Sequence, residues 1–291
     1  MSHKSKQFLW QACKIAVALF TVGYIVWYLQ QTDFQEQNIL DYLKSMPLYF
    51  WMLLPVFSIS SWMMETIKWQ LLATSSQRIT FTQSLYQNLT SQAASFLTPL
   101  RAGEFALKAS YFQQHQRKNI LKAVAYGNFC QMTVTVIFGA IGWWYLADLP
   151  WWIFFIGFLI LLILMILSPR LHQRLSLSAA IAPILGLSAL RYVLFSSSWL
   201  LLLSYSSMSP TPMIISCITA MYLTVSIVPS MQLFDLALKW SVASFFADSL
   251  AISMESMTAI VAVVWLFNTV LPVVLGSLML PFPQFQKAAI S

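Results

Sequence analysis

The sequence predicts an all-α, polytopic membrane protein in which six transmembrane helices and two re-entrant, broken helical hairpins form an inverted repeat. The first observation is composition: 59% of the 291 residues are hydrophobic and 9% are charged, whereas soluble proteins carry about 25% charged residues. The second is a mean hydropathy of +0.71, and the third is a charged stretch that occurs twice. The positive residues lie between apolar runs, so the net charge of +7 indicates membrane topology and not nucleic acid binding.

The repeated stretch places charged residues in apolar surroundings. The first copy, SFLTPLRAGEFALKASYF, covers residues 95–112, and the second, VSIVPSMQLFDLALKWSVASFF, covers residues 225–246. In each copy a proline is followed by an acid and then, four residues later, by a lysine, which is the favoured order for an i,i+4 pair on a helix. The matched residues are Pro99 and Pro229, Glu104 and Asp235, and Lys108 and Lys239. We expect a degenerate repeat, because the proline-to-acid spacing differs by one residue.

The first copy predicts a helical hairpin with a break at its tip. Thr98 is a good N-cap and Pro99 fits the first position of a helix, so a short helix should begin there. Gly103 leaves room for a neighbouring backbone. Residues 85–98 are too polar for a lipid-facing helix and too apolar for a solvated loop, so we expect them to be buried in protein. The hairpin should enter from the cytoplasm and return there, with its tip shielded by protein or facing a watery cavity.

Apolar runs give the remaining elements. The predicted crossings are residues 8–29, 47–64, 123–146, 151–167, 179–205 and 257–280, and the second hairpin is residues 213–228 and 230–246. Loops predicted inside are basic and those outside are acidic, which places both termini in the cytoplasm of a protein of the cell (inner) membrane. Glu65, Lys68 and Trp69 follow the second crossing, where we expect a charged and aromatic interface.

The order of these elements predicts one membrane domain over residues 1–291. Two crossings, a hairpin and a third crossing make repeat 1, at about residues 8–146, and the same set in the opposite orientation makes repeat 2, at about residues 151–281. Inverted repeats of this kind occur in many secondary transporters, whose substrate site lies near the midplane between the repeats.

A binding site for an anion is predicted at the hairpin tips. Each second half-helix starts at a tip, so two helix N-termini, each carrying about half a positive charge, would point at the membrane centre. Arg101 and Arg191 add fixed charge, and the arginine fork suits phosphate. The predicted substrate-binding residues are Pro99, Arg101, Gly103, Glu104, Lys108, Arg191, Pro229, Asp235 and Lys239. An alternative for the two acid–lysine pairs is that they are structural ion pairs which pin the hairpins.

The function that these features favour is binding a phosphate-bearing amphiphile and moving it across the membrane, with a membrane lipid or another anionic amphiphile as partner. The alternative is a non-transporting membrane partner or assembly protein whose charged hairpins are structural. We expect no enzyme activity, no catalytic residues, no metal and no cofactor, because the sequence has no glycine-rich phosphate loop, metal-ligand spacing or nucleophile–histidine set.

The chain resembles the membrane, flippase-like domain of the lysylphosphatidylglycerol synthases and their stand-alone relatives. Residues 99–108, PLRAGEFALK, are similar to that family's Pro-x-x-x-Gly-Glu/Asp-x-x-x-Arg motif, with Lys108 in place of arginine. Lys68-Trp69, Arg191-Tyr192 and Pro229 with its acid and lysine resemble further family features, whereas Lys239 and Phe234 depart from the expected arginine and glycine. The resemblance implies lipid translocation or another lipid-linked role. The synthase chemistry, which belongs to a separate cytosolic domain of that family, is not expected here.

Overall fold

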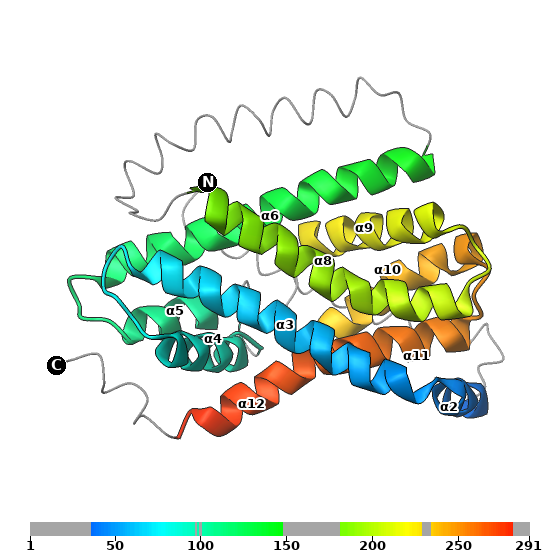
Figure 1. Ribbon diagram of the computed structural model, residues 1–291, viewed down its shortest axis with the longest axis horizontal. Helices are drawn as coiled ribbons and strands as arrows, with labels where there is room; N and C mark the ends of the chain where they lie inside the picture. Colours follow the sequence, from blue (N-terminus) through cyan, green and yellow to red (C-terminus); the bar gives the residue numbers. More distant parts are fainter. Residues whose placement is uncertain (1–35, 97, 99–100, 148–180, 229–233, 282–291) are drawn as a thin grey trace, which may run out of the picture.

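The computed structural model describes residues 36–281 except 97, 99–100, 148–180 and 229–233. The predicted crossings at 8–29 and 151–167, together with Pro99 and Pro229, lie outside the described residues. Across the described ranges the chain forms helices joined by turns (Figure 1). This agrees with the predicted all-α class.

The elements, in chain order, are α2 (Glu36–Ser45), α3 (Leu48–Ala73), α4 (Phe81–Phe96), α5 (Ala102–Ser110), α6 (Arg117–Ala147), α8 (Ile181–Ser206), α9 (Thr211–Ile227), α10 (Asp235–Ala247), η2 (Asp248–Leu250), α11 (Met254–Trp265), η3 (Leu266–Val270) and α12 (Leu271–Met279). Four described segments are long and apolar enough to cross a membrane: α3, α6, α8, and the continuous helix made by α11, η3 and α12. They correspond to four of the six predicted crossings.

The last of these helices contains a π-helical turn, η3. The backbone N–H of Leu271 donates to the carbonyl of Leu266, five residues earlier. Pro272 follows directly and has no N–H to donate to the carbonyl four residues before it, which is the ordinary cause of a defect at this point in a helix. Single π turns inside α-helices occur frequently at functional sites. This one exposes the side chains of Asn268 and Thr269 to a central cavity, described below.

The first pair of short helices, α4 and α5, forms an antiparallel hairpin. Near the base, the hydroxyls of Thr90 and Tyr111 are 2.7 Å apart. Near the tip, a Cβ on Gly103 would lie 2.2 Å from the carbonyl oxygen of Ala94. The expected role of Gly103, to admit a neighbouring backbone, is confirmed.

The second pair, α9 and α10, enters from the opposite end of the molecule (Figure 1). At that end the turns before α9 and after α10 meet, because Ser207 Oγ donates to the carbonyl of Leu250 at 2.6 Å. The turns flanking the first hairpin meet in the same way, through Gln116 Nε2 and the carbonyl of Ser76 at 3.2 Å. Each hairpin therefore begins and ends at its own end of the molecule, and its two helices run from there toward the middle (Figure 1).

The helices around the hairpins pack in a reciprocal pattern. The last helix of each predicted repeat packs on the first helix of the other repeat's hairpin. Thus α6 of repeat 1 packs on α9 of repeat 2, and α12 of repeat 2 packs on α4 of repeat 1. Glycines permit both contacts, since a Cβ on Gly142 would lie 2.1 Å from Thr219 Oγ1 and one on Gly276 would lie 2.0 Å from the Leu89 carbonyl oxygen. Small residues let membrane helices approach closely. Helix α3 packs on α8 across the centre.

The predicted start of α5 at Pro99 is wrong by three residues. The helix begins at Ala102, and Arg101 precedes it in a left-handed backbone conformation with φ of 57°. Thr98 still performs a capping role from outside the helix, because its Oγ1 accepts a hydrogen bond from the backbone N–H of Gly103 at 2.8 Å. The left-handed turn lets a threonine further back in the chain reach an N–H group that has no partner inside the helix.

Candidate functional site

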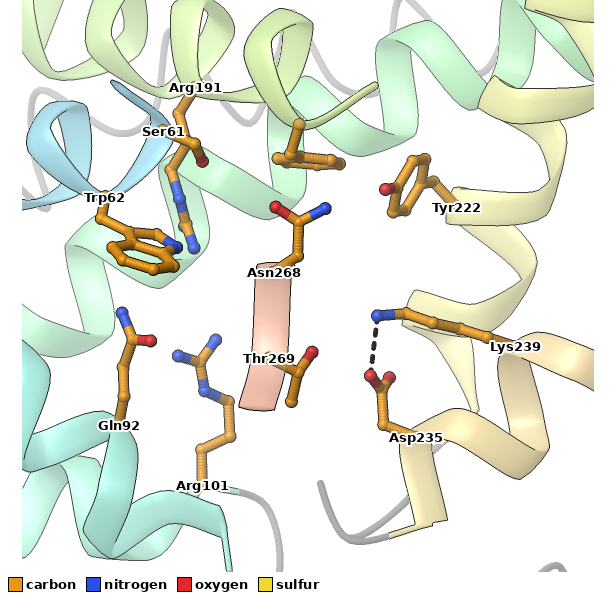
Figure 2. Close-up of a pocket in the computed structure, with 11 residues that line it drawn as sticks. Ser61, Trp62, Gln92, Arg101, Arg191, Tyr222, Asp235, Lys239, Asn268 and Thr269 are labelled. Atoms are coloured by element: carbon orange, nitrogen blue, oxygen red, sulfur yellow. Dashed lines mark ion pairs between the residues drawn. The ribbon is translucent and has the colours of Figure 1, made fainter. Parts of the chain in front are cut away.

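A cavity of about 260 Å³ lies between the helices of the two hairpins (Figure 2). Helices α3, α4, α8, α9 and α10, the residue before α5 and the π turn η3 all contribute side chains to it. The lining residues are Ser61, Trp62, Gln92, Arg101, Arg191, Phe195, Tyr222, Asp235, Lys239, Asn268 and Thr269. Four of the predicted site residues, Arg101, Arg191, Asp235 and Lys239, therefore lie at one cavity.

The charged pair of the second hairpin faces the cavity. Lys239 Nζ lies 2.7 Å from Asp235 Oδ2, and the two side chains are 13% and 18% exposed (Figure 2). Helix α10 begins at Asp235, so its N-terminal turn is also at the cavity wall. The i,i+4 pairing is as predicted, and both partners remain accessible to a molecule in the cavity.

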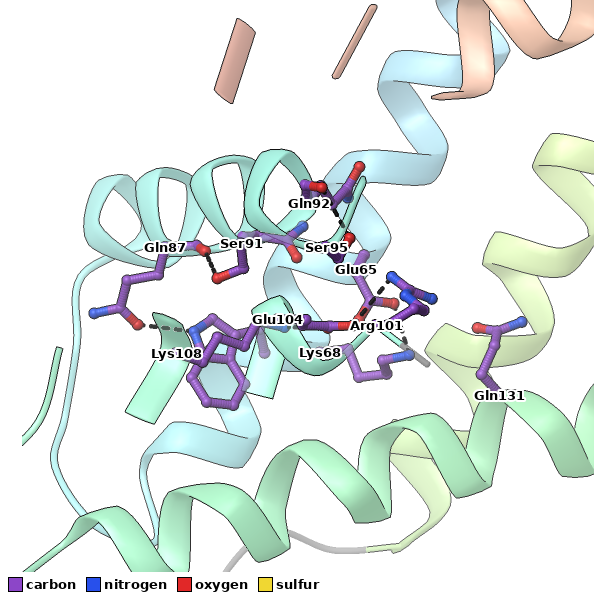
Figure 3. A network of polar contacts seen from close by, with 12 residues as sticks. Glu65, Lys68, Gln87, Ser91, Gln92, Ser95, Arg101, Glu104, Lys108 and Gln131 are labelled. Carbon is purple, nitrogen blue, oxygen red and sulfur yellow. Dashed lines mark hydrogen bonds and ion pairs between the residues drawn. The ribbon is translucent and has the colours of Figure 1, made fainter. Parts of the chain in front are cut away.

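The corresponding pair of the first hairpin is buried and does not reach the cavity. Lys108 Nζ lies 2.9 Å from Glu104 Oε1, and the two side chains are 2% and 3% exposed. Lys108 also lies over the ring of Trp69, 4.5 Å from its centroid, and Trp69 is held by a 2.8 Å hydrogen bond from its Nε1 to Gln87 Oε1 (Figure 3). Neither Glu104 nor Lys108 lines the cavity. For this pair the geometry favours the structural alternative.

Two arginines line the cavity, and each forms an ion pair with an acid that is not part of the lining. Arg101 Nη2 lies 3.1 Å from Glu104 Oε2, so Glu104 joins Arg101 to Lys108. Arg191 Nη1 lies 2.9 Å from Glu65 Oε2 and 3.5 Å from Gln131 Oε1. Both acids bind terminal guanidinium nitrogens and so fix the direction in which each arginine points.

The prediction that Glu65 and Lys68 lie in a charged interface at the end of the second crossing is wrong. Helix α3 continues to Ala73, so the two residues lie inside the protein, with Glu65 7% and Lys68 1% exposed. Lys68 Nζ lies 2.7 Å from the same Glu65 oxygen that binds Arg191. The signal that could have revealed this pair is its i,i+3 spacing, which puts both charges on one face of the helix.

Sequence reasoning also missed the uncharged lining residues. Asn268 is the clearest case: its Oδ1 accepts a 2.8 Å hydrogen bond from Ser58 Oγ, which leaves its Nδ2 without a partner. The polar arm before the first tip, which contains Gln92, was expected to be buried in protein, and Gln92 is 7% exposed. Gly103 packs on Ala94 and does not line the cavity.

The charges around the cavity do not cancel. Among the described residues, the groups that form ion pairs at or next to the cavity are five bases and three acids. The bases are Lys68, Arg101, Lys108, Arg191 and Lys239, and the acids are Glu65, Glu104 and Asp235. Charges in the interior of a membrane protein are costly and are functional candidates by default. The charged residues of the lining itself are three bases, Arg101, Arg191 and Lys239, and one acid, Asp235. This excess of two positive charges, near the N-termini of α5 and α10, favours an anionic ligand.

Comparison with known proteins gives one result that agrees with the helical spans. The family model described as the lysylphosphatidylglycerol synthase TM region matches residues 12–182. Since this is more than half of the chain, the protein belongs to that family and is a membrane protein with several apolar helices. The matched range includes Glu65, Arg101 and Glu104, whereas Arg191, Asp235 and Lys239 follow it. No curated protein sequence matches this chain.

Proposed function

We propose that this member of the lysylphosphatidylglycerol synthase TM region family binds a phosphate-bearing amphiphile between its hairpin tips and moves it across the membrane. The observation that carries the proposal is the central cavity, where cations from both hairpins and from α8 meet. Its volume of about 260 Å³ suits a lipid head group, since the pockets that enclose drug-sized ligands have volumes of about 300–1,000 Å³. The acyl chains would remain in the bilayer.

The arrangement of the hairpins supports an alternating-access mechanism. Helices α5, α9 and α10 have 9, 17 and 13 residues, fewer than the roughly 20 that a crossing needs, so each hairpin would re-enter the side it came from. The hairpins open at opposite ends, and the reciprocal packing of α6 on α9 and α12 on α4 is what an inverted repeat requires. Such repeats move against each other around a fixed central site.

The predicted topology completes the proposal. We place crossings at residues 8–29 and 151–167 in addition to the four spans of the described part, and both termini in the cytoplasm of the cell (inner) membrane. The C-terminal end of α6 and the N-terminal end of α8 lie on opposite sides of the middle of the molecule (Figure 1), as a crossing between them would demand. We assign the protein no enzymatic step, cofactor or metal; its partner is a lipid or another anionic amphiphile.

Reconstitution tests this function directly. Purified protein is placed in liposomes that contain a trace of fluorescent short-chain lipid, and an impermeant quencher reports the fraction that changes leaflet. Anionic lipids should move faster than in protein-free liposomes, and the Lys239→Met variant should reduce the rate to that background. If folded protein moves none of the anionic or zwitterionic lipids tested, the alternative of a non-transporting membrane partner, with Glu104–Lys108 as its structural pair, would be favoured.

A further inference from the structure

Unpartnered N–H donors gather in the central cavity. In the described part of the chain, four buried nitrogens of its lining have no hydrogen-bond partner: Trp62 Nε1, Arg101 Nε, Arg191 Nε and Asn268 Nδ2. The side chains of Trp62, Arg101 and Arg191 lie on the same side of the cavity (Figure 2). Leaving a buried donor unpaired costs about 1–3 kcal/mol. Four unpaired donors in one cavity, three of them on one side, indicate a place where an acceptor binds.

The side chains are aimed as a ligand site would require. Figure 2 shows the guanidinium groups of Arg101, the residue before α5, and Arg191 of α8 pointing toward one another, with Trp62 and Gln92 beside them. Glu104 and Glu65 hold these arginines through Nη2 and Nη1 respectively, so each Nε remains for another partner. Two guanidinium groups that face each other repel, and an anion between them would remove that repulsion.

Charge distinguishes among the anions. The groups that form ion pairs at or next to the cavity carry two more positive than negative charges, as described above. A phosphomonoester carries about −1.5 to −2 at pH 7 and presents three terminal oxygens, whereas a phosphodiester carries one negative charge and has two such oxygens. Trp62, at 5% exposure, adds a neutral donor to the two arginines, which makes three donors for three oxygens.

We propose that Trp62, Arg101 and Arg191 form a seat for a terminal phosphate, so that the ligand is a phosphomonoester and not a phosphodiester. This rests on the proposed function, which it narrows to one class of head group. Arg101 and Arg191 supply charge and forked hydrogen bonds. Trp62 supplies the third N–H and sets the preference for a terminal phosphate.

The test measures binding to the full chain in detergent, using thermal stabilisation and calorimetry. The ligands are short-chain phosphatidic acid, short-chain phosphatidylglycerol and inorganic phosphate. Phosphatidic acid should bind at least tenfold more tightly than phosphatidylglycerol. Inorganic phosphate binding as tightly as phosphatidic acid would show that the free ion is the ligand of the seat, and would overturn the assignment to an amphiphile. Equal or tighter binding of phosphatidylglycerol would overturn the seat while leaving the transport proposal intact.

Single substitutions separate the seat from general folding effects. Trp62→Phe keeps an aromatic ring and removes the N–H, and it should weaken phosphatidic acid binding by about tenfold, the value of one hydrogen bond to a charged group. Trp265→Phe is the matched control, because Trp265 Nε1 is also buried and unpartnered but lies outside the cavity lining. Arg101→Lys keeps the charge and removes the fork, and it should weaken binding similarly. If Trp62→Phe folds and binds phosphatidic acid as the unaltered chain does, the seat is wrong.

Discussion

Arg191 of α8 donates from Nη1 to Oε2 of Glu65 on α3 at 2.9 Å, across a separation of 126 residues. In the predicted inverted repeat these helices occupy matching places, each being the second crossing of its half. The ion pair therefore joins the two halves at the wall of the cavity. Any movement of one half against the other has to change this contact.

We predict that Arg191→Leu abolishes lipid movement and leaves the membrane level nearly unchanged. Glu65 keeps a partner in this variant, because Lys68 Nζ lies 2.7 Å from the same carboxylate oxygen. Lipid movement in liposomes, membrane level and thermal unfolding are measured together. Glu65→Leu is the contrasting variant: it leaves the buried Lys68 without its acid and should lower the free energy of unfolding by about 3–5 kcal/mol. An active Arg191→Leu protein would remove Arg191 from the site.

The two matched lysines should respond in opposite ways. Lys108→Met removes a buried cation–π contact, worth about 2 kcal/mol when desolvated, while Glu104 keeps Arg101 at 3.1 Å. This variant should lose stability and keep transport. Lys239→Met removes a partly exposed cavity cation, so it should keep stability and lose transport.

Thermal unfolding and lipid movement, measured on both lysine variants, decide between the two roles. The double variant Glu104→Gln with Lys108→Met should be more stable than Glu104→Gln alone, because removing both partners leaves no buried lysine without its acid. Loss of transport in a stable Lys108→Met protein would show that the first hairpin pair serves the substrate after all.

The features that could be predicted from the sequence are those that depend on local pattern. Hydropathy located the four spans that the structure describes, and the polar arm before Pro99 indicated a hairpin buried in protein. The two i,i+4 pairs followed from spacing alone. The Glu65–Arg191 pair could not be predicted, because it depends on how α3 crosses α8. Spacing also gave no means to tell that Lys108 would be covered by Trp69 while its counterpart would face a cavity.

Glycine substitutions should show which helix contacts are tight. A Cβ on Gly276 would lie 2.0 Å from the Leu89 carbonyl oxygen, and backbone cannot move aside easily. We expect Gly276→Ala to separate α12 from α4 and to lower the melting temperature markedly. Gly186→Ala is the matched control, since no atom of the described residues lies within 4 Å of its added Cβ, and it should gain up to about 1 kcal/mol from helix propensity. Equal melting temperatures for the two variants would contradict the close packing of α12 on α4.

The opposite openings of the hairpins predict a pattern of labelling across the membrane. Met208, between α8 and α9, is 98% exposed, and the exposed Ser249 lies in the turn after α10. The Ser207–Leu250 hydrogen bond places these two turns together. The segment between α5 and α6, which contains the exposed Gln114, lies at the other end of the molecule (Figure 1).

Single cysteines at these three positions test the topology with an impermeant maleimide on intact cells. The background carries serine at Cys13, Cys130 and Cys217. Met208→Cys and Ser249→Cys should be labelled from outside, because the turns near them carry acids, whereas Gln114→Cys, beside a basic run, should react only after the cells are opened. Labelling of Met208→Cys and Ser249→Cys from different sides would mean that the second hairpin, which lies between them, crosses the membrane completely. The two halves would then not be inverted, and the alternating-access mechanism would lose its structural basis.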